Sequence, residues 1–154
     1  MNKPLFVSEV EIKNKTLTRF VCLPGEKDPM ITFNPKRDSI LDFLKKQNIK
    51  VINDSFGVYY IDRRKYGVEK VKWDACVPVR QKIEVEKPFL YKELPACKVS
   101  SVILTGGYDL IGKALEWMEY RLKEMNIEAK WPLIEIYVKE EDTPITELQY
   151  TMVS

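Results

Sequence analysis

The chain has 154 residues, of which 45% are hydrophobic, and its 25 basic and 23 acidic residues leave a net charge of +2. This length and composition are typical of one folded domain, and the balanced charge excludes the basic footprint of a nucleic-acid-binding surface. The sequence contains no histidine, which excludes Ser-His and Cys-His catalytic pairs and histidine-bearing zinc sites.

The first half of the chain predicts a strand, a helix and two further strands. Residues 16–23 form the first apolar strand. The segment NPKRDSILDFLKKQN predicts a helix, with Asn34 as its cap and Pro35 at its first position. Strands are then expected over residues 56–62 and 69–79.

Two other segments of this half are assigned to loops. PGEKDPMITFNP, which holds three prolines and a glycine, predicts an extra loop that lies over the space between the halves. RRKYG, at residues 63–67, is interpreted as a short basic turn at the surface.

The second half repeats the order of the first. Residues 98–105 predict a strand, and a helix is expected from Tyr108 to Met125 with Asp109 as its cap. Strands follow at 132–138 and 146–154. Its helix carries apolar residues at helical spacing: Ile111, Leu115, Met118, Leu122 and Met125.

A shift of 77 positions superimposes the halves, placing Tyr60 on Tyr137 and Trp73 on Tyr150; near the helix ends the shift becomes 78. The repeat predicts a duplicated βαββ module with pseudo-two-fold symmetry. We expect a single domain, 1–154, with halves at about 1–79 and 93–154 and a partly extended linker at about 80–92. Alternatively, any two α/β units of equal length resemble each other at this level.

Glu135 interrupts an apolar run, PLIEIYV. Because strand side chains alternate between faces, Leu133, Glu135 and Tyr137 share one face, which suits a cleft. Ile134, Ile136 and Val138 share the other, which suits a helix-packed core. The shift of 77 matches Glu135 with Val58, so one half supplies a carboxylate to the cleft and the other an aliphatic wall.

A carboxylate at this position has three interpretations. Glu135 either faces solvent, or pairs with a flat cationic ligand stacked on aromatic rings, or acts as a general acid or base with a raised pKa.

Three segments resemble the GyrI-like domain family. They are KVKWDACVPV, ELPACKVSSVILTGGYDLIGKALEWMEYRLKE and WPLIEIYVKEEDTP, and they cover residues 57–154 well and the first 56 residues weakly. The sequence departs from the family pattern with Gly-Gly-Tyr at 106–108, in place of Gly-Pro-Tyr, and with a longer loop at 24–35. No helix-turn-helix module is attached.

The resemblance implies an α+β fold, in which two βαββ modules form one antiparallel sheet with both helices packed against it. Family members include effector-binding domains of AraC-type and multidrug-responsive transcription regulators, gyrase-inhibitor-like proteins, and a branch that hydrolyses cyclopropane-containing toxins. They bind small molecules in a cleft between the halves. The glutamate matching Glu135 is a central pocket residue in the multidrug-binding members.

We therefore expect a stand-alone binding protein for a small apolar molecule, either neutral or cationic. The expected ligand-binding residues are Glu135, Tyr137, Tyr60, Trp73, Tyr150 and Tyr108. The alternative for the four aromatic residues in strands is an ordinary sheet position, and the alternative for Tyr108, at the helix start, is a packing or turn position. One alternative is a hydrolase of strained electrophiles, with Glu135 as the catalytic residue beside a tyrosine. Another is a gyrase-inhibitor-like protein-interaction module, and a separate protein partner is compatible with each.

The three cysteines, Cys22, Cys76 and Cys97, are far apart and odd in number. A reducing compartment is the simplest interpretation, and Cys76 is interpreted as a small core residue. No signal peptide or membrane-spanning segment is recognisable, so a cytoplasmic protein is expected. We expect no cofactor, no metal, no direct contact with nucleic acid and no membrane association.

Overall fold

The computed structural model describes residues 1–152. The elements in chain order are β1 (Glu11–Lys15), β2 (Thr18–Gly25), α1 (Pro29–Lys46), β3 (Phe56–Tyr59), α2 (Arg63–Tyr66), β4 (Trp73–Val79), β5 (Leu90–Leu94), β6 (Cys97–Thr105), the 3₁₀ turn η1 (Tyr108–Leu110), α3 (Ile111–Glu124), β7 (Lys130–Lys139) and β8 (Ile145–Met152). The last two residues of the predicted strand 146–154 lie outside the described residues. None of the helices within residues 1–152 is long and apolar enough to cross a membrane.

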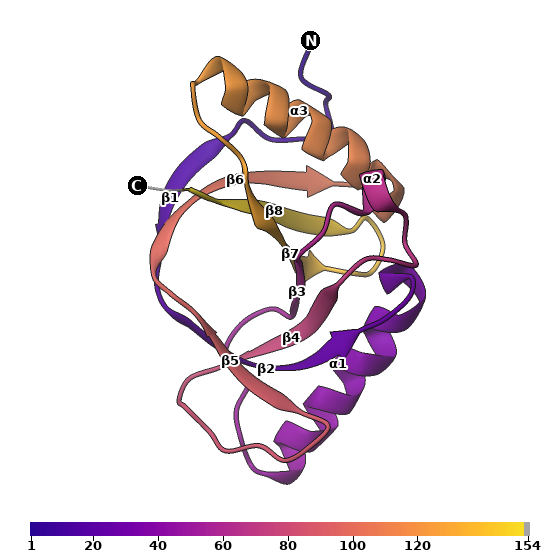
Figure 1. The fold of residues 1–154 in the computed structure, drawn as a ribbon, viewed down its shortest axis with the longest axis vertical. Helices are drawn as coiled ribbons and strands as arrows, with labels where there is room; N and C mark the ends of the chain where they lie inside the picture. Colours follow the sequence, from indigo (N-terminus) through magenta and orange to yellow (C-terminus); the bar gives the residue numbers. More distant parts are fainter. Residues whose placement is uncertain (153–154) are drawn as a thin grey trace.

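All eight strands belong to one antiparallel sheet, in the order β1-β6-β8-β7-β3-β4-β2-β5. The order is mirrored about the central β7–β3 pair, because β4 and β2 follow β3 as β8 and β6 follow β7. The sheet is curled, and α1 and α3 both lie on its outer side (Figure 1). The predicted α+β fold, two βαββ units with two helices against one sheet, is confirmed.

The outermost strands, β1 and β5, were not predicted. Each crosses to the other half: β1 pairs with β6, and β5 pairs with β2. β5 begins at Leu90, inside the predicted linker 80–92. Their sequences, EIKNK and LYKEL, carry charges that protect exposed sheet edges from wrong pairing, and such strands lack a strong apolar signal.

Helix α1 begins earlier than predicted. Asp28 is its cap, accepting a hydrogen bond from the Met30 amide at 3.0 Å, and Pro29 is the first helical residue. Asn34 is therefore not the cap, and Pro35 lies inside the helix. The pair Asp28-Pro29 carries the same cap-then-proline signal as Asn34-Pro35, and the earlier pair starts the helix. Most of the predicted loop is thus helix.

Helix α3 begins at Ile111 and is entered through η1. Asp109 lies within this turn, and no side chain caps α3. The prediction of Asp109 as a cap was wrong because the chain enters the helix through a 3₁₀ turn, in which the Leu110 amide donates to the Gly107 carbonyl at 3.0 Å.

The sheet buries apolar side chains on both faces. The outer face packs against α1 and α3 and includes Leu133. The inner face buries a smaller cluster: Phe20, Cys22, Phe56, Val58, Cys76 and Ile134. The buried position predicted for Cys76 is confirmed. The predicted orientation of β7 was wrong, because Ile134 faces away from the helices and Glu135 faces them. The curl of the sheet lets its helix-free face bury aliphatic residues against each other.

Candidate functional site

Glu135 lies in the middle of β7, at the seam between the two halves. Its paired residues are Gly57 on β3 and Leu148 on β8. The residue is only 1% exposed, so the solvent-facing interpretation of Glu135 is wrong. A buried carboxylate needs compensation from a positive charge or from hydrogen-bond donors.

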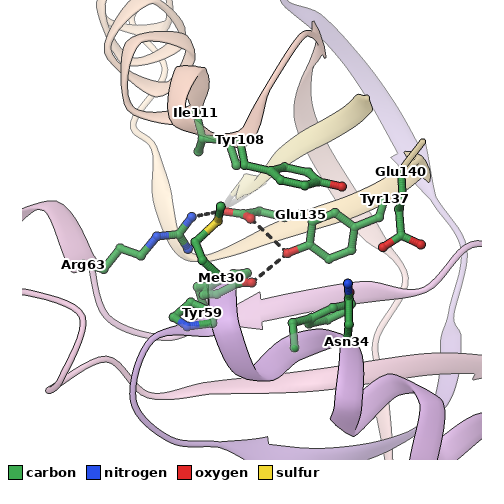
Figure 2. Close-up of a pocket in the computed structure, with 11 residues that line it drawn as sticks. Met30, Asn34, Tyr59, Arg63, Tyr108, Ile111, Glu135, Tyr137 and Glu140 are labelled. Carbon is green, nitrogen blue, oxygen red and sulfur yellow. Dashed lines mark hydrogen bonds and ion pairs between the residues drawn. The ribbon is translucent and has the colours of Figure 1, made fainter. Parts of the chain in front are cut away.

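A cavity of about 60 Å³ lies directly beside Glu135 (Figure 2). Its walls come from the start of α1, from β3, α2 and β7, and from the turn that leads into α3. The lining residues are Pro29, Met30, Phe33, Asn34, Tyr59, Arg63, Tyr108, Ile111, Glu135, Tyr137 and Glu140. The predicted segment over the space between the halves is therefore present, as the first turns of α1.

A second hollow of about 200 Å³ adjoins the first. Its additional walls include Asp62 and Arg64 at the start of α2, Leu115 of α3 and Trp131 of β7. The residues common to both hollows are Met30, Tyr59, Arg63, Tyr108 and Ile111. These five side chains therefore border both hollows.

Two tyrosines connect Glu135 to the opposite half through hydrogen bonds. The Tyr137 hydroxyl donates to Glu135 Oε1 at 3.1 Å, and the Tyr59 and Tyr137 hydroxyl oxygens lie 2.7 Å apart. An ionised carboxylate only accepts hydrogen bonds. The Tyr137 hydroxyl therefore donates its hydrogen bond to Glu135, and the Tyr59 hydroxyl donates to the Tyr137 oxygen. Burial is the main cause that raises the pKa of both tyrosines, and both remain proton donors at neutral pH.

Arg63, the first residue of α2, provides the positive charge. Its Nη2 lies 3.1 Å from Glu135 Oε2, and its guanidinium lies over the Tyr59 ring, 4.6 Å from the centroid. Figure 2 shows Arg63 approaching Glu135 from the side opposite Tyr137. The interpretation of RRKYG as a surface turn was wrong for its first arginine, whose side chain is 19% exposed.

A signal for this short helix exists in the sequence. Asp62 caps α2 by accepting from the Arg64 amide at 3.0 Å, and Gly67 follows the helix with a positive φ of 79°. An Asp and a Gly that bracket four residues are a cap and a stop, although so short a helix has no apolar periodicity to support it.

The buried carboxylate is only partly compensated. Burial is the main cause that raises the pKa of Glu135, and the opposing effects of Arg63 and the Tyr137 hydroxyl do not restore it. Among the described residues, no group donates a well-aligned hydrogen bond to Oε2. The ion pair with Arg63 is therefore the one polar contact of that oxygen among the described residues.

The predicted site residues are distributed over three places. Glu135, Tyr137 and Tyr108 line the cavity. Trp73 and Tyr150 are buried on the same face of the sheet but do not line the cavity, and each packs against another aromatic residue. Trp73 stacks on Tyr59 with ring centroids 6.0 Å apart, and Tyr150 packs against Trp131 at 5.6 Å.

Tyr60 lies away from the cavity. It is 42% exposed, and its hydroxyl donates to Asp74 at 2.7 Å on the other side of the sheet. Because Gly57 pairs with Glu135, the residues of β3 on the cavity side are Gly57 and Tyr59, whereas Val58 faces the inner cluster. The matches of Tyr60 with Tyr137 and of Val58 with Glu135 were wrong by one residue, which reverses the face of a strand.

An ion pair between Arg37 of α1 and Glu140, just beyond β7, closes the edge of the cavity. Tyr108 lies above Tyr137 in Figure 2, and their rings meet edge to face with centroids 6.0 Å apart. Within residues 1–152, no group of three or more Cys, Asp and Glu side chains converges to hold a metal ion. The site offers aromatic surface, the Glu135 carboxylate paired with Arg63 and, at its edge, the Glu140 carboxylate paired with Arg37.

Comparison with known proteins agrees with this geometry. The family model described as "GyrI-like small molecule binding domain" matches residues 8–153. No curated protein matches the chain in sequence.

Several solved structures share the fold. EcmrR, in a complex with DNA, superimposes with a TM-score of 0.84 at 14% identity over 98% of this chain, and the chain spans 59% of EcmrR. A hydrolase from Listeria innocua gives a TM-score of 0.73 at 10% identity, covering 95% of this chain and 92% of the hydrolase. SAV2435, bound to tetraphenylphosphonium, gives a TM-score of 0.63 at 12% identity, covering 96% of this chain and 95% of SAV2435.

Proposed function

The chain belongs to the GyrI-like small-molecule-binding domain family, and from this premise we propose that it binds a small, apolar organic cation in the cavity beside Glu135. One observation carries the proposal: Glu135 is 1% exposed and lies against a cavity walled by tyrosine rings from both halves. Arg63 already pairs with this carboxylate at 3.1 Å, but a buried ion pair is weak evidence for stability alone, and the cavity beside it gives a ligand access to the carboxylate.

The ligand class follows from the chemistry of the walls. Tyr59, Tyr108 and Tyr137 offer π-faces and edges, and a cation over an aromatic face gains about 0.5–2 kcal/mol per contact. The Glu135 carboxylate adds an opposite charge in a site with little water, where the attraction is strong. SAV2435, of the same fold, binds tetraphenylphosphonium, a large organic cation with four aromatic rings, which supports this class of ligand.

Titration with tetraphenylphosphonium tests the proposal. Trp73 stacks on Tyr59, so tryptophan fluorescence should change as the cavity fills. A ligand that binds only the folded protein also raises its stability, by about 2.7 kcal/mol at 100 times Kd. We expect Glu135→Gln to weaken binding at least tenfold, because the neutral amide no longer attracts the cation.

Glu147→Gln is the matched control. Glu147 is a partly buried glutamate on the neighbouring strand, but it pairs with Lys13 at 2.6 Å on the other face of the sheet. This variant should bind tetraphenylphosphonium as the wild type does. If the wild type and Glu135→Gln bind tetraphenylphosphonium with equal affinity, the proposed charge pairing between Glu135 and the ligand is wrong.

A second candidate is a hydrolase of strained electrophiles, and the raised pKa of Glu135 favours it. A cavity of about 60 Å³ is large enough for a water molecule. Glu135 would take a proton from this water while the water oxygen attacks the strained carbon. The ring bond breaks, and the protonated Glu135 returns the proton to the leaving atom. A protein of the same fold, from Listeria innocua, is described as a hydrolase.

Turnover separates the two candidates. Wild type and Glu135→Gln are incubated with a panel of epoxides and electrophilic cyclopropanes, and ring-opened product is measured. The hydrolase predicts product from the wild type and a rate at least 100-fold lower for the variant. If both proteins form product at equal rates, or if neither forms product, the hydrolase function is ruled out and the binding function is retained.

A further inference from the structure

Arg63 already makes with Glu135 the contacts that a bound organic cation would make. Its guanidinium pairs with the carboxylate at 3.1 Å and covers the Tyr59 ring at 4.6 Å. The pairing of a cation with both a carboxylate and an aromatic face is the recognition chemistry of the proposed ligand. In the ligand-free protein, a side chain of the chain itself therefore occupies the ligand's electrostatic position.

The attachment of Arg63 is weak compared with that of its neighbour. Arg63 uses one nitrogen, and among the described residues nothing donates a well-aligned hydrogen bond to Glu135 Oε2. Arg64 instead makes a two-nitrogen contact with Asp62, at 3.0 and 2.9 Å, and reaches both oxygens of Glu119 on α3 at 2.9 and 2.8 Å. A forked contact holds a guanidinium more firmly than a single nitrogen does.

The packing of α2 also leaves Arg63 free to move. This helix has four residues, and none of them is buried. Few buried contacts hold such a segment in place, and segments of this kind open at low free energy. Arg64 holds α2 to α3, so α2 stays attached on one side while Arg63 withdraws on the other.

The size of the cavity requires such a movement. The hollow beside Glu135 measures about 60 Å³ and its neighbour about 200 Å³, whereas pockets for drug-sized ligands measure about 300–1,000 Å³. Arg63 and Met30 line both hollows. Met30 is 61% exposed and flexible, so withdrawal of Arg63 joins the hollows into one cavity with Glu135 at its inner end.

We propose that Arg63 is a built-in counter-ion of Glu135, which an incoming organic cation displaces from the carboxylate and from the Tyr59 ring. This inference rests on the proposed function. It adds that the site selects cations over anions of the same shape. A cation replaces the guanidinium and keeps Glu135 neutralised. An anion of the same shape makes no favourable contact with Glu135. If it expelled Arg63, it would be repelled by the unpaired carboxylate.

Two probes of the same shape and opposite charge test the competition: tetraphenylphosphonium and tetraphenylborate. Arg63→Met removes the internal cation but keeps an unbranched apolar side chain. At pH 8, we expect this variant to bind tetraphenylphosphonium at least tenfold more tightly than the wild type, with no gain for tetraphenylborate. Lys65→Met, which removes an exposed charge from the same helix, should leave both affinities within twofold.

The outcomes distinguish the inference from the function on which it rests. If the wild type binds tetraphenylphosphonium through Glu135 but Arg63→Met binds it equally or less tightly, the displacement of Arg63 is wrong and the binding function stands. If neither protein binds the cation, both are wrong. Binding by Arg63→Met but not by the wild type would mean that Arg63 blocks the site and is not displaced, which also overturns the inference.

A measurement on the wild type covers the case in which Arg63→Met does not fold. The side-chain Nε–H signal of Arg63 is followed by NMR, and its exchange with water is measured with and without saturating tetraphenylphosphonium. We expect exchange to accelerate at least tenfold for Arg63 and to stay unchanged for Arg64. Equal exchange for Arg63 in the free and bound proteins overturns the inference.

Discussion

The hydroxyl oxygens of Tyr59 and Tyr137 lie 2.7 Å apart, one on β3 of the first half and one on β7 of the second. The antiparallel pairing of these two strands brings the halves together at this point. Tyr137 continues the chain of hydrogen bonds to Glu135 at 3.1 Å. The carboxylate is therefore held in place by side chains from both halves.

Tyr59→Phe removes the first donor of this chain. The Tyr137 hydroxyl then loses a partner in a buried site, and a typical hydrogen bond contributes about 0.5–1.5 kcal/mol. We expect the free energy of unfolding, measured with urea, to fall by about 1 kcal/mol. Tyr66→Phe, at an exposed tyrosine of α2, should change it much less, and an equal loss in both variants would contradict the buried chain.

Gly57→Ala tests the space that the Tyr59 ring needs. A Cβ on Gly57 would lie 2.6 Å from the ring and 2.8 Å from its hydroxyl oxygen. Tyr59 is stacked on Trp73, so the added methyl pushes its ring toward the cavity that it lines. Overpacking should cost about 1–3 kcal/mol of stability and weaken binding of tetraphenylphosphonium.

Gly112→Ala is the control for stability. Nothing lies within 4 Å of a Cβ at this position in α3, and alanine in a helix interior stabilises by about 0.5–1 kcal/mol relative to glycine. Melting temperatures of the two variants should therefore move in opposite directions. A stable Gly57→Ala with unchanged affinity would show that the close approach of Tyr59 has no role.

The six inner strands along the chain and the special environment of Glu135 were predictable because they depend on strong local signals. Apolar runs marked the six inner strands, and a glutamate inside one of them indicated a special environment. The residue of the first half that contacts Tyr137 is Tyr59, 78 positions earlier. The 77-residue shift pointed to Tyr60 and so was wrong by one residue. A glycine inside a strand marks a close approach of other atoms, so Gly57 was the available sign that β3 meets β7 at Glu135.

Arg63 was beyond sequence reasoning for a different reason. Its importance arises from a contact between residues 72 positions apart (135 − 63), across strands whose pairing was unknown. Edge strands β1 and β5 were missed because their charged sequences resemble linkers. In each case the missing information was tertiary pairing.

The raised pKa of Glu135 predicts how stability depends on pH. Burial raises this pKa above its value of about 4.3 in the unfolded chain. The folded protein therefore holds the proton more tightly, and this stabilising contribution is complete below pH 4 and is lost as pH rises through the folded pKa.

Urea unfolding of wild type and Glu135→Gln between pH 4 and pH 8 measures that contribution. The wild type should lose stability relative to the variant as the pH rises. Asp62 and Glu147, whose pKa values are lowered by hydrogen bonds that outweigh burial, act in the opposite direction but are common to both proteins. A difference that is constant with pH would mean that Glu135 titrates as in the unfolded chain.

Arg63→Met should destabilise the protein more at pH 8 than at pH 5. Without the guanidinium, the carboxylate of Glu135 is either ionised and unpaired, at a cost of about 3–5 kcal/mol, or protonated. Low pH favours the protonated form, so the loss of stability is smaller there. The double variant Arg63→Met/Glu135→Gln should lose this dependence on pH, and its persistence would assign the effect to another group.

A crystal structure of the protein with tetraphenylphosphonium tests the central claim most directly. We predict the cation in the joined hollows, with a phenyl ring against Tyr59, the carboxylate of Glu135 facing the phosphonium centre, and the Arg63 side chain turned to solvent. A cation found on the inner face of the sheet, or on the outside of the molecule with Arg63 still on Glu135, would contradict it.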